Sequence, residues 1–316
     1  MKLYIGIDLG GTNIGAGIVD ENGKILLQDE VPTGASRPFQ EVIKDMAGLV
    51  EAIIEQGGYT VSDIESIGIG SPGSMDREQG KVVFANNLGW RHVPVREELQ
   101  KYIDLPVYLE NDANVAGLAE SVAGACQGVD NSVTITLGTG VGSGIIIDGK
   151  PYSGSHGVGA ELGHIIVHAG GIQCNCGNRG CLEEYASASA LIREGRKVAK
   201  ENPDSLIAKS ADGDLDKVNA KVVIDAAKAG DTKALEVFDN YIYYLTMGII
   251  TTINMLDPSI IAIGGGVSKA GDFLLDAIRK SVDEHIFYKD KPYAKIYLSE
   301  LGNDAGIIGA AMLGRL

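Results

Sequence analysis

Two stretches of the chain repeat one pattern, and this repeat decides the expected fold. The first is IDLGGTNIGAGIVDENGK at residues 7–24, and the second is ITLGTGVGSGIIIDGK at residues 135–150. Each reads as two strands around a glycine turn, and the two stretches align at a constant offset. The matched pairs are Leu9 with Leu137, Ile18 with Ile146, and Asp20 with Asp148. A chance likeness of two glycine hairpins is the alternative, but internal duplication is the natural inference.

Strand and helix signals follow both repeats in the same order. After the first hairpin we expect a strand at 25–31, a helix at 39–55, a strand at 64–69, a short helix at 95–102 and a strand at 106–109. After the second we expect mostly helix at 188–256 with a polar interruption at 202–217, a strand at 259–263, a helix at 273–286, a strand at 295–298 and a closing helix at 304–316. This order predicts an α/β fold with a duplicated core.

The length of the chain supports two lobes, because single cores stop growing near roughly 250 to 300 residues and this chain has 316. We expect a small α/β lobe at 1–117. A large α/β lobe is expected at 118–303, with the helical insertion inside it.

The composition argues against several classes of protein. Lys and Arg number 27 against 42 Asp and Glu, and a net charge of −15 leaves no basic surface for a nucleic-acid backbone. The longest uncharged run, at 241–256, is shorter than the ~20 apolar residues of a membrane helix. The N-terminal apolar run is too short and too rich in glycine for a signal peptide. We therefore expect a cytoplasmic protein that binds neither nucleic acid nor membrane.

The two glycine turns expose backbone N–H groups that can bind phosphate oxygens. A third glycine run follows the expected strand at 259–263, so three such loops favour a nucleotide site. Asp8 can hold a hydrated Mg²⁺ that bridges the phosphates. The candidate nucleotide residues are Asp8, Gly10, Gly11, Thr12, Asn13, Gly138, Thr139, Gly140, Gly264, Gly265 and Gly266.

A different glycine motif, GIGSPG at residues 68–73, has the spacing of the dinucleotide-binding fingerprint. It contains Pro72 and is followed by SMDRE rather than by an apolar helix start, so the required context is missing. We reject a Rossmann site there, and no Walker A pattern occurs in the chain.

Asp112 follows the expected strand at 106–109 and is a candidate general base. Asn111 beside it can orient a hydroxyl while Asp112 accepts its proton during attack on a phosphoryl group. The alternative is that Asp112 only caps the helix that begins at Ala113. The sequence leaves both interpretations open.

Three of the four cysteines lie in QCNCGNRGCLEE at residues 173–184. A disulfide framework is disfavoured in a reducing compartment, and C-x-C is not the C-x-x-C of redox sites. Three thiolates and one imidazole form a typical structural zinc site, with His168 as a rival fourth ligand and Cys126 outside it as a buried thiol. The expected ligands are His164, Cys174, Cys176 and Cys181.

Four motifs together resemble the repressor, open reading frame, kinase (ROK) family over essentially the whole chain. They are IDLGGTN at 7–13, LENDAN at 109–114, GAELGH at 159–164 and CNCGNRGCLEEYAS at 174–187. The resemblance implies a two-lobed, actin-like, hexokinase-type fold of the ribonuclease H-like class, in which the closing helix at about 304–316 joins the small lobe. It also implies transfer of the γ-phosphoryl group of MgATP to the 6-hydroxyl of glucose, by a homodimer.

The same resemblance assigns roles to individual residues. It makes Asp112 the general base, and the zinc ligands match the set above. The implied sugar contacts are Gly73, Asn86, Asn87, Asn111, Asp112, Glu161, His164 and Glu183.

Two alternatives stay open at the level of function. Another hexose, or an N-acetylhexosamine such as N-acetylmannosamine or N-acetylglucosamine, is the nearest rival of glucose, because motifs do not reveal the pocket walls. The alternative from a different functional class is a sugar-sensing regulator without catalytic activity. The first strand begins at Leu3, so we expect no winged-helix region ahead of the fold.

Overall fold

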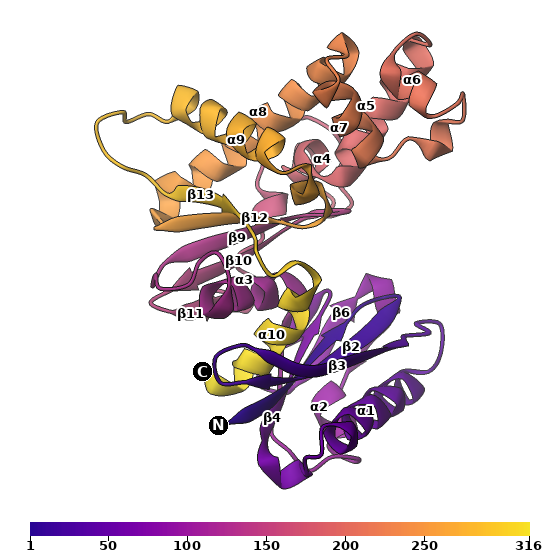
Figure 1. The fold of residues 1–316 in the computed structure, drawn as a ribbon, viewed down its shortest axis with the longest axis vertical. Helices are drawn as coiled ribbons and strands as arrows, with labels where there is room; N and C mark the ends of the chain where they lie inside the picture. Colours follow the sequence, from indigo (N-terminus) through magenta and orange to yellow (C-terminus); the bar gives the residue numbers. More distant parts are fainter. The chain divides into compact units, whose positions relative to one another are not determined.

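The structure is a computed structural model that describes residues 1–316. Its internal contacts divide the chain into two compact units. Unit 1 comprises Met1–Ser132, Gly144–Ala160 and Glu300–Leu316, and unit 2 comprises Val133–Ser143 and Glu161–Ser299. Helices accompany β-sheets along the whole chain, as Figure 1 shows, so the expected α/β class is confirmed.

The first five-stranded sheet lies in unit 1 and has the order β3-β2-β1-β4-β8. Its strands are β1 (Leu3–Leu9), β2 (Asn13–Asp20), β3 (Ile25–Pro32), β4 (Ile64–Ser71) and β8 (Val107–Asn111). β1 pairs antiparallel with β2 across the first glycine turn and parallel with β4, which in turn pairs parallel with β8. The carboxyl ends of β1, β4 and β8 therefore lie at one edge, where open α/β sheets bind ligands.

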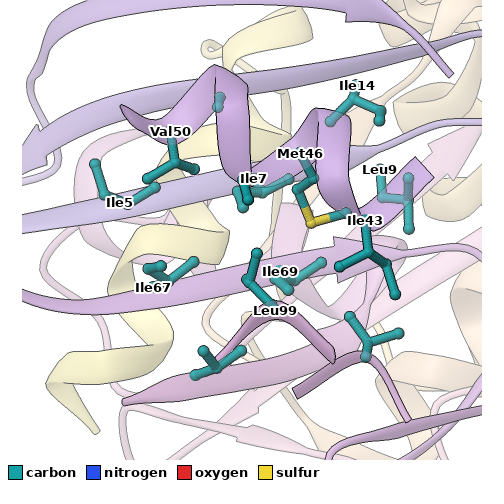
Figure 2. Packing of buried hydrophobic residues seen from close by; sticks show 14 of the residues in the cluster. Ile5, Ile7, Leu9, Ile14, Ile43, Met46, Val50, Ile67, Ile69 and Leu99 are labelled. Carbon is teal, nitrogen blue, oxygen red and sulfur yellow. The ribbon is translucent and has the colours of Figure 1, made fainter. Parts of the chain in front are cut away.

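One face of this sheet packs against helix α1 (Phe39–Gln56) to form the core of unit 1 (Figure 2). The odd-numbered side chains of β1 point to this face, while α1 contributes residues at helical spacing. The labelled side chains are Ile5, Ile7, Leu9, Ile14, Ile43, Met46, Val50, Ile67, Ile69 and, from α2 (Val95–Leu99), Leu99. All are 0% exposed, and each contributes about 1.5–3 kcal/mol to folding.

The opposite face of the sheet packs against the C-terminal helix α10 (Ala305–Met312), which contacts β1 and β4. Glycine makes this approach possible at two positions. A Cβ added to Gly6 would lie 1.9 Å from the carbonyl oxygen of Ile307, and one added to Gly68 would lie 1.7 Å from that of Ala310. The backbones of strand and helix therefore touch without intervening side chains.

A second five-stranded sheet has the order β11-β10-β9-β12-β13. Its strands are β9 (Ser132–Leu137), β10 (Val141–Ile147), β11 (Lys150–Tyr152), β12 (Ile260–Gly264) and β13 (Lys295–Leu298). The strand order repeats that of the first sheet: three consecutive strands of a meander, then two strands that arrive after helical segments. The duplication inferred from the sequence thus appears as the same strand order in two sheets.

A third, three-stranded sheet was not predicted. It has the order β5-β6-β7 and consists of β5 (Ser74–Asp76), β6 (Lys81–Ala85) and β7 (Trp90–Val93). These strands are too short for a clear alternation of apolar and polar residues. They follow the GIGSPG motif directly, which agrees with the rejection of a Rossmann site there.

The helices α3 (Asp112–Ala123) and α4 (Glu183–Ala186) each begin beside a candidate site residue. The remaining helices are α5 (Ala188–Glu201), α6 (Leu206–Ser210), α7 (Ala220–Lys228), α8 (Thr232–Leu256) and α9 (Asp272–His285). The expected polar interruption at 202–217 contains only the short α6 and a 3₁₀ turn. No helix combines the length and the apolar character that crossing a membrane requires.

Candidate active site and metal centre

The candidate base lies where β8 meets α3, at the ligand-binding edge of the first sheet. Asn111 caps α3, because its side-chain oxygen accepts a hydrogen bond from the N–H of Ala113 at 2.9 Å. Asp112 occupies the first helical position, and its Oδ1 accepts from the same N–H at 2.8 Å. The capping role that the sequence offered for Asp112 therefore belongs mainly to Asn111. Asp112 remains accessible to solvent.

Two carboxyl groups near this sheet edge, those of Asp8 and Asp112, have raised pKa values. Partial desolvation raises the pKa of Asp112, against the lowering effect of the hydrogen bond from Ala113. Burial raises the pKa of Asp8 to about 6, and the negative charge of Asp112 adds to this increase. Carboxyl groups shifted toward neutral pH are typical of sites that exchange protons or bind cations.

Asp8 lies in a hollow of about 550 Å³ whose lining includes Asn13, Asp29 and Asp304. The start of α10 is packed tightly against the carboxyl group: a Cβ added to Gly306 would lie 2.5 Å from its Cγ. The hollow is strongly acidic. A cation would therefore be needed before a phosphate could bind close to Asp8.

The first glycine turn is held by a residue that the sequence analysis did not single out. Thr33 is fully buried, its hydroxyl donates to the carbonyl of Gly10 at 2.7 Å, and its N–H donates to the carbonyl of Thr12 at 2.8 Å. A Cβ on Gly11 would lie 3.4 Å from the carbonyl oxygen of Asn87. The turn and the predicted sugar contact Asn87 are therefore neighbours.

Gly73 and Asn111 are also brought together. Asn111 donates from Nδ2 to the carbonyl of Gly73 at 3.0 Å. Gly73 has a φ of +94°, and a Cβ there would lie 2.0 Å from the carbonyl oxygen of Phe84, so only glycine fits. Asn86 lies with Asn87 in the short 3₁₀ turn Asn86–Leu88 that follows β6.

The other two glycine loops meet in unit 2. The turn at Gly138–Gly140 follows β9 and is fixed by α5, because Ala188 N–H donates to the carbonyl of Gly138 and Ser189 Oγ donates to that of Thr139 at 2.7 Å. A Cβ on Gly265 would lie 2.5 Å from the carbonyl oxygen of Leu137. The run at 264–266 therefore packs against the end of β9, next to the turn at Gly138–Gly140.

The predicted zinc ligands form one cluster in unit 2. The ligand atoms of His164, Cys174, Cys176 and Cys181 all lie within 4.8 Å of one another. Cys176 Sγ is 3.6 Å from Cys181 Sγ, and Cys174 Sγ is 3.8 Å from His164 Nδ1. Donors placed 2.0–2.3 Å from a tetrahedral ion lie about 3.3–3.8 Å apart, so these two distances fit a shared zinc ion.

His168, the rival ligand, lies outside this cluster. Its ring stacks on Tyr244 with centroids 6.2 Å apart, and its Nδ1 lies 3.2 Å from the Tyr244 hydroxyl.

Burial raises the pKa of Cys181 to about 12, while the N–H of Asn178 lowers the pKa of Cys176. A buried neutral thiol becomes a thiolate when a metal cation binds it.

The cluster ties together the two segments that carry the predicted sugar carboxylates of unit 2. Glu161 immediately precedes the 3₁₀ turn Leu162–His164, so one short turn joins Glu161 to His164. Leu182 N–H donates to the carbonyl of Ile165 at 2.9 Å. The chain around His164 is thereby joined to the turn that ends at Cys181.

Glu183, two residues after the last cysteine, contacts the second glycine turn. Its Oε2 accepts a hydrogen bond from Val141 N–H at 3.0 Å. A Cβ on Gly140 would lie 2.1 Å from the same oxygen. One carboxylate therefore connects the cysteine cluster to a candidate phosphate turn, a link that spacing along the chain does not reveal.

Comparison with known proteins agrees with this geometry. Two sheets of the same strand order, with a glycine turn after the first strand of each, define an actin-like sugar-kinase fold. The model of the ROK family matches residues 4–315, and the chain belongs to this family. It is 42% identical to a glucokinase of Thermotoga maritima over 313 residues, which are 98% of this chain and 96% of that protein.

Solved structures give the same result. A ROK family glucokinase from Streptomyces griseus, in complex with glucose and AMPPNP, matches with a TM-score of 0.83 and 39% identity, covering 99% of each chain. The ROK hexokinase from Thermus thermophilus matches with a TM-score of 0.85 and 32% identity, covering 98% of this chain and 97% of that one.

Proposed function

We propose that the protein is a glucokinase that transfers the γ-phosphoryl group of MgATP to the 6-hydroxyl of glucose. One observation carries the proposal: a chain that matches a glucokinase over nearly its full length has both the Asn111–Asp112 pair at the sheet edge and the paired glycine turns. The products are glucose 6-phosphate and ADP.

Asp112 acts as the general base in this reaction. Its carboxylate accepts the proton of the 6-hydroxyl while the oxygen forms a bond to the γ-phosphorus and the bond from that phosphorus to the β-phosphate oxygen breaks. The raised pKa of Asp112 favours this proton transfer, because a base is most effective when its pKa lies close to the working pH.

The sugar contacts keep their assignment from the family pattern. Asn111 supplies an amide, Gly73 a backbone group, and Glu161 and Glu183 supply carboxylates. Carboxylates and amides on fixed elements suit vicinal hydroxyls, which are both donors and acceptors at fixed spacing. His164 can serve twice, because its Nδ1 faces Cys174 and leaves Nε2 for a hydroxyl.

The glycine turns bind the phosphates of ATP through their backbone N–H groups. Asp8 would hold Mg²⁺ through water in its acidic hollow. When bound, Mg²⁺ neutralises the charge that develops on the transferred phosphoryl group.

The cysteine cluster holds structural zinc in this proposal. All four donors belong to the protein, which leaves no open position for a substrate and is typical of structural sites. Its function is to fix the segments that carry Glu161 and Glu183. We also propose a cytoplasmic homodimer, for which light scattering is the test of assembly.

A coupled assay of ADP formation across hexoses tests the function. We expect the highest kcat/KM with glucose and little turnover of N-acetylglucosamine or N-acetylmannosamine. Faster turnover of an acetamido sugar would replace glucose as the substrate. Sugar binding without ADP formation from any hexose would instead support a sensor without catalysis.

A further inference from the structure

A partly buried ion pair that has no assigned role lies directly beside the candidate base. Arg77, one residue after β5, donates from Nε and Nη2 to the two carboxylate oxygens of Glu110, both at 2.5 Å. The Glu110 side chain is 6% exposed and that of Arg77 is 29% exposed. Two parallel bonds between planar groups fix orientation as well as distance.

Glu110 transmits this orientation to the base. It immediately precedes Asn111 and Asp112, and its Oε1 accepts from the backbone N–H of Asn111 at 2.7 Å. The same oxygen accepts from Nδ2 of Asn114, in the first turn of α3, at 3.0 Å. The carboxylate therefore holds both sides of the strand-to-helix junction at which Asp112 lies.

Arg77 also reaches the glycine loop at 153–160. Its Nη1, which does not bond to Glu110, lies so close to Gly157 that a Cβ there would be 2.6 Å from it. Gly157 has a φ of +71° and lies four residues before the predicted sugar contact Glu161. One guanidinium therefore contacts the junction before Asp112 and the glycine loop at the same time.

The position of Arg77 is itself fixed by a second arginine. Arg96 in α2 donates from Nη2 to the carbonyl of Arg77 and from Nε to the carbonyl of Val107, both at 2.8 Å. Val107 is the first residue of β8, the strand that ends at Asn111. The hairpin that carries Arg77 is thus tied to β8 at both ends of that strand.

We propose that Arg77 is a positioning residue for phosphoryl transfer, acting through Glu110 to hold Asp112 at the sugar 6-hydroxyl. The proposal rests on the proposed function and adds a residue to it. Arg77 touches neither substrate in this account. It stabilises the geometry of the base, and a displacement of about 1 Å in such a geometry can cost on the order of 10²-fold in rate.

The test compares Arg77→Met, Arg77→Lys and the control Arg315→Met. Arg315 lies in the same unit, and its guanidinium donates to the carbonyl of Glu21, far in sequence from the base. Each variant is assayed for kcat and KM, for glucose binding by calorimetry in the presence of AMPPNP, and for melting temperature. Rates are expressed per folded molecule.

We expect Arg77→Met to lower kcat about 10²-fold with little change in glucose affinity, and Arg77→Lys to restore part of the rate. Arg315→Met should keep the wild-type kcat. If Arg77→Met does not fold, Arg77→Lys decides, since its single ammonium cannot form the two parallel bonds. A folded Arg77→Lys with the wild-type kcat would overturn the proposal.

Two further outcomes would also overturn it: an Arg77→Met variant whose only defect is a lower melting temperature, or an equal loss of kcat in Arg315→Met. The wild-type protein reports separately on the proposed function. If it phosphorylates a hexose other than glucose, the substrate assignment fails and the same variants are compared on that hexose.

Discussion

Asp112 has two properties that a base in phosphoryl transfer needs. It is accessible to solvent, so it can reach a hydroxyl, and partial desolvation raises its pKa, which makes its carboxylate a stronger proton acceptor. Since Asn111 already caps α3, removing the negative charge of Asp112 should leave the helix start in place.

The variant Asp112→Asn should therefore lower kcat by about 10²- to 10⁴-fold and keep the fold and the affinity for glucose. ADP release and calorimetric glucose titration measure the two effects. Asp104→Asn, an exposed acid in the same unit, is the control and should behave as the wild type. A rate for Asp112→Asn within tenfold of the wild type would mean that another group is the base.

The raised pKa of Asp8 predicts how the free energy of unfolding depends on pH. Its pKa in the folded protein is about 6, above the ordinary 3.8, so the folded state binds this proton more tightly than the unfolded state. The resulting stabilisation is complete below about pH 4 and is lost as the pH rises through 6. At neutral pH, burial of the charge then destabilises the free protein.

Asp8→Asn should accordingly raise the free energy of unfolding by about 1–3 kcal/mol at pH 7.5 in the absence of Mg²⁺, and by almost nothing at pH 4. Urea unfolding at both pH values measures this. MgATP turnover should fall in the same variant. An equal gain at both pH values would show that the acidity of Asp8 is not the cause.

At the scale of elements, regular strands and long helices could be predicted from the sequence, because alternation and helical spacing are local properties. The clustering of His164 with three cysteines could be predicted for the same reason, since the cysteines lie within eight residues of one another. Contacts between distant segments could not. Thr33 holds a turn 23 residues away, and Arg77 pairs with a carboxylate 33 residues away.

The cluster of His164 and the three cysteines leads to a prediction about the segment at 164–183 that it holds together. Cys176→Ala removes an exposed ligand, so the protein should lose zinc, melt at a lower temperature and bind glucose on the order of tenfold more weakly. Because Glu183 also bonds to Val141 N–H, AMPPNP binding should weaken as well, though less.

Elemental analysis and calorimetry provide the measurements, with Cys126→Ala as the control that should keep its zinc. Active wild-type protein that contains no zinc would contradict the proposal that the cluster binds structural zinc. Loss of AMPPNP binding with intact glucose binding would contradict the assignment of the cluster to the sugar side.

At the scale of the whole molecule, the duplicated sheets could be predicted from the sequence, and the family resemblance implied that the closing helix returns to the first lobe. The close backbone contact of α10 with the sheet was not predicted. In the sequence, Gly68 and Gly70 have the spacing of a dinucleotide-binding motif. In the structure, glycine occupies these positions because other segments pack closely against them. Gly68 lies against the backbone of Ala310 in α10, and a Cβ on Gly70 would contact Val115 in α3 at 3.2 Å. The spacing follows from close packing, which no local pattern distinguishes from a ligand loop.

Gly68→Ala should therefore be strongly destabilising, because its methyl group would have to lie 1.7 Å from a backbone oxygen and α10 would move off the sheet. We expect a loss above about 3 kcal/mol in unit 1. Gly48→Ala is the matched control: it is exposed within α1, has nothing within 4 Å of the added atom, and should stabilise by about 0.5–1 kcal/mol. Urea unfolding compares the two, and equal stabilities would mean that α10 adjusts to the sheet without needing glycine at its contact.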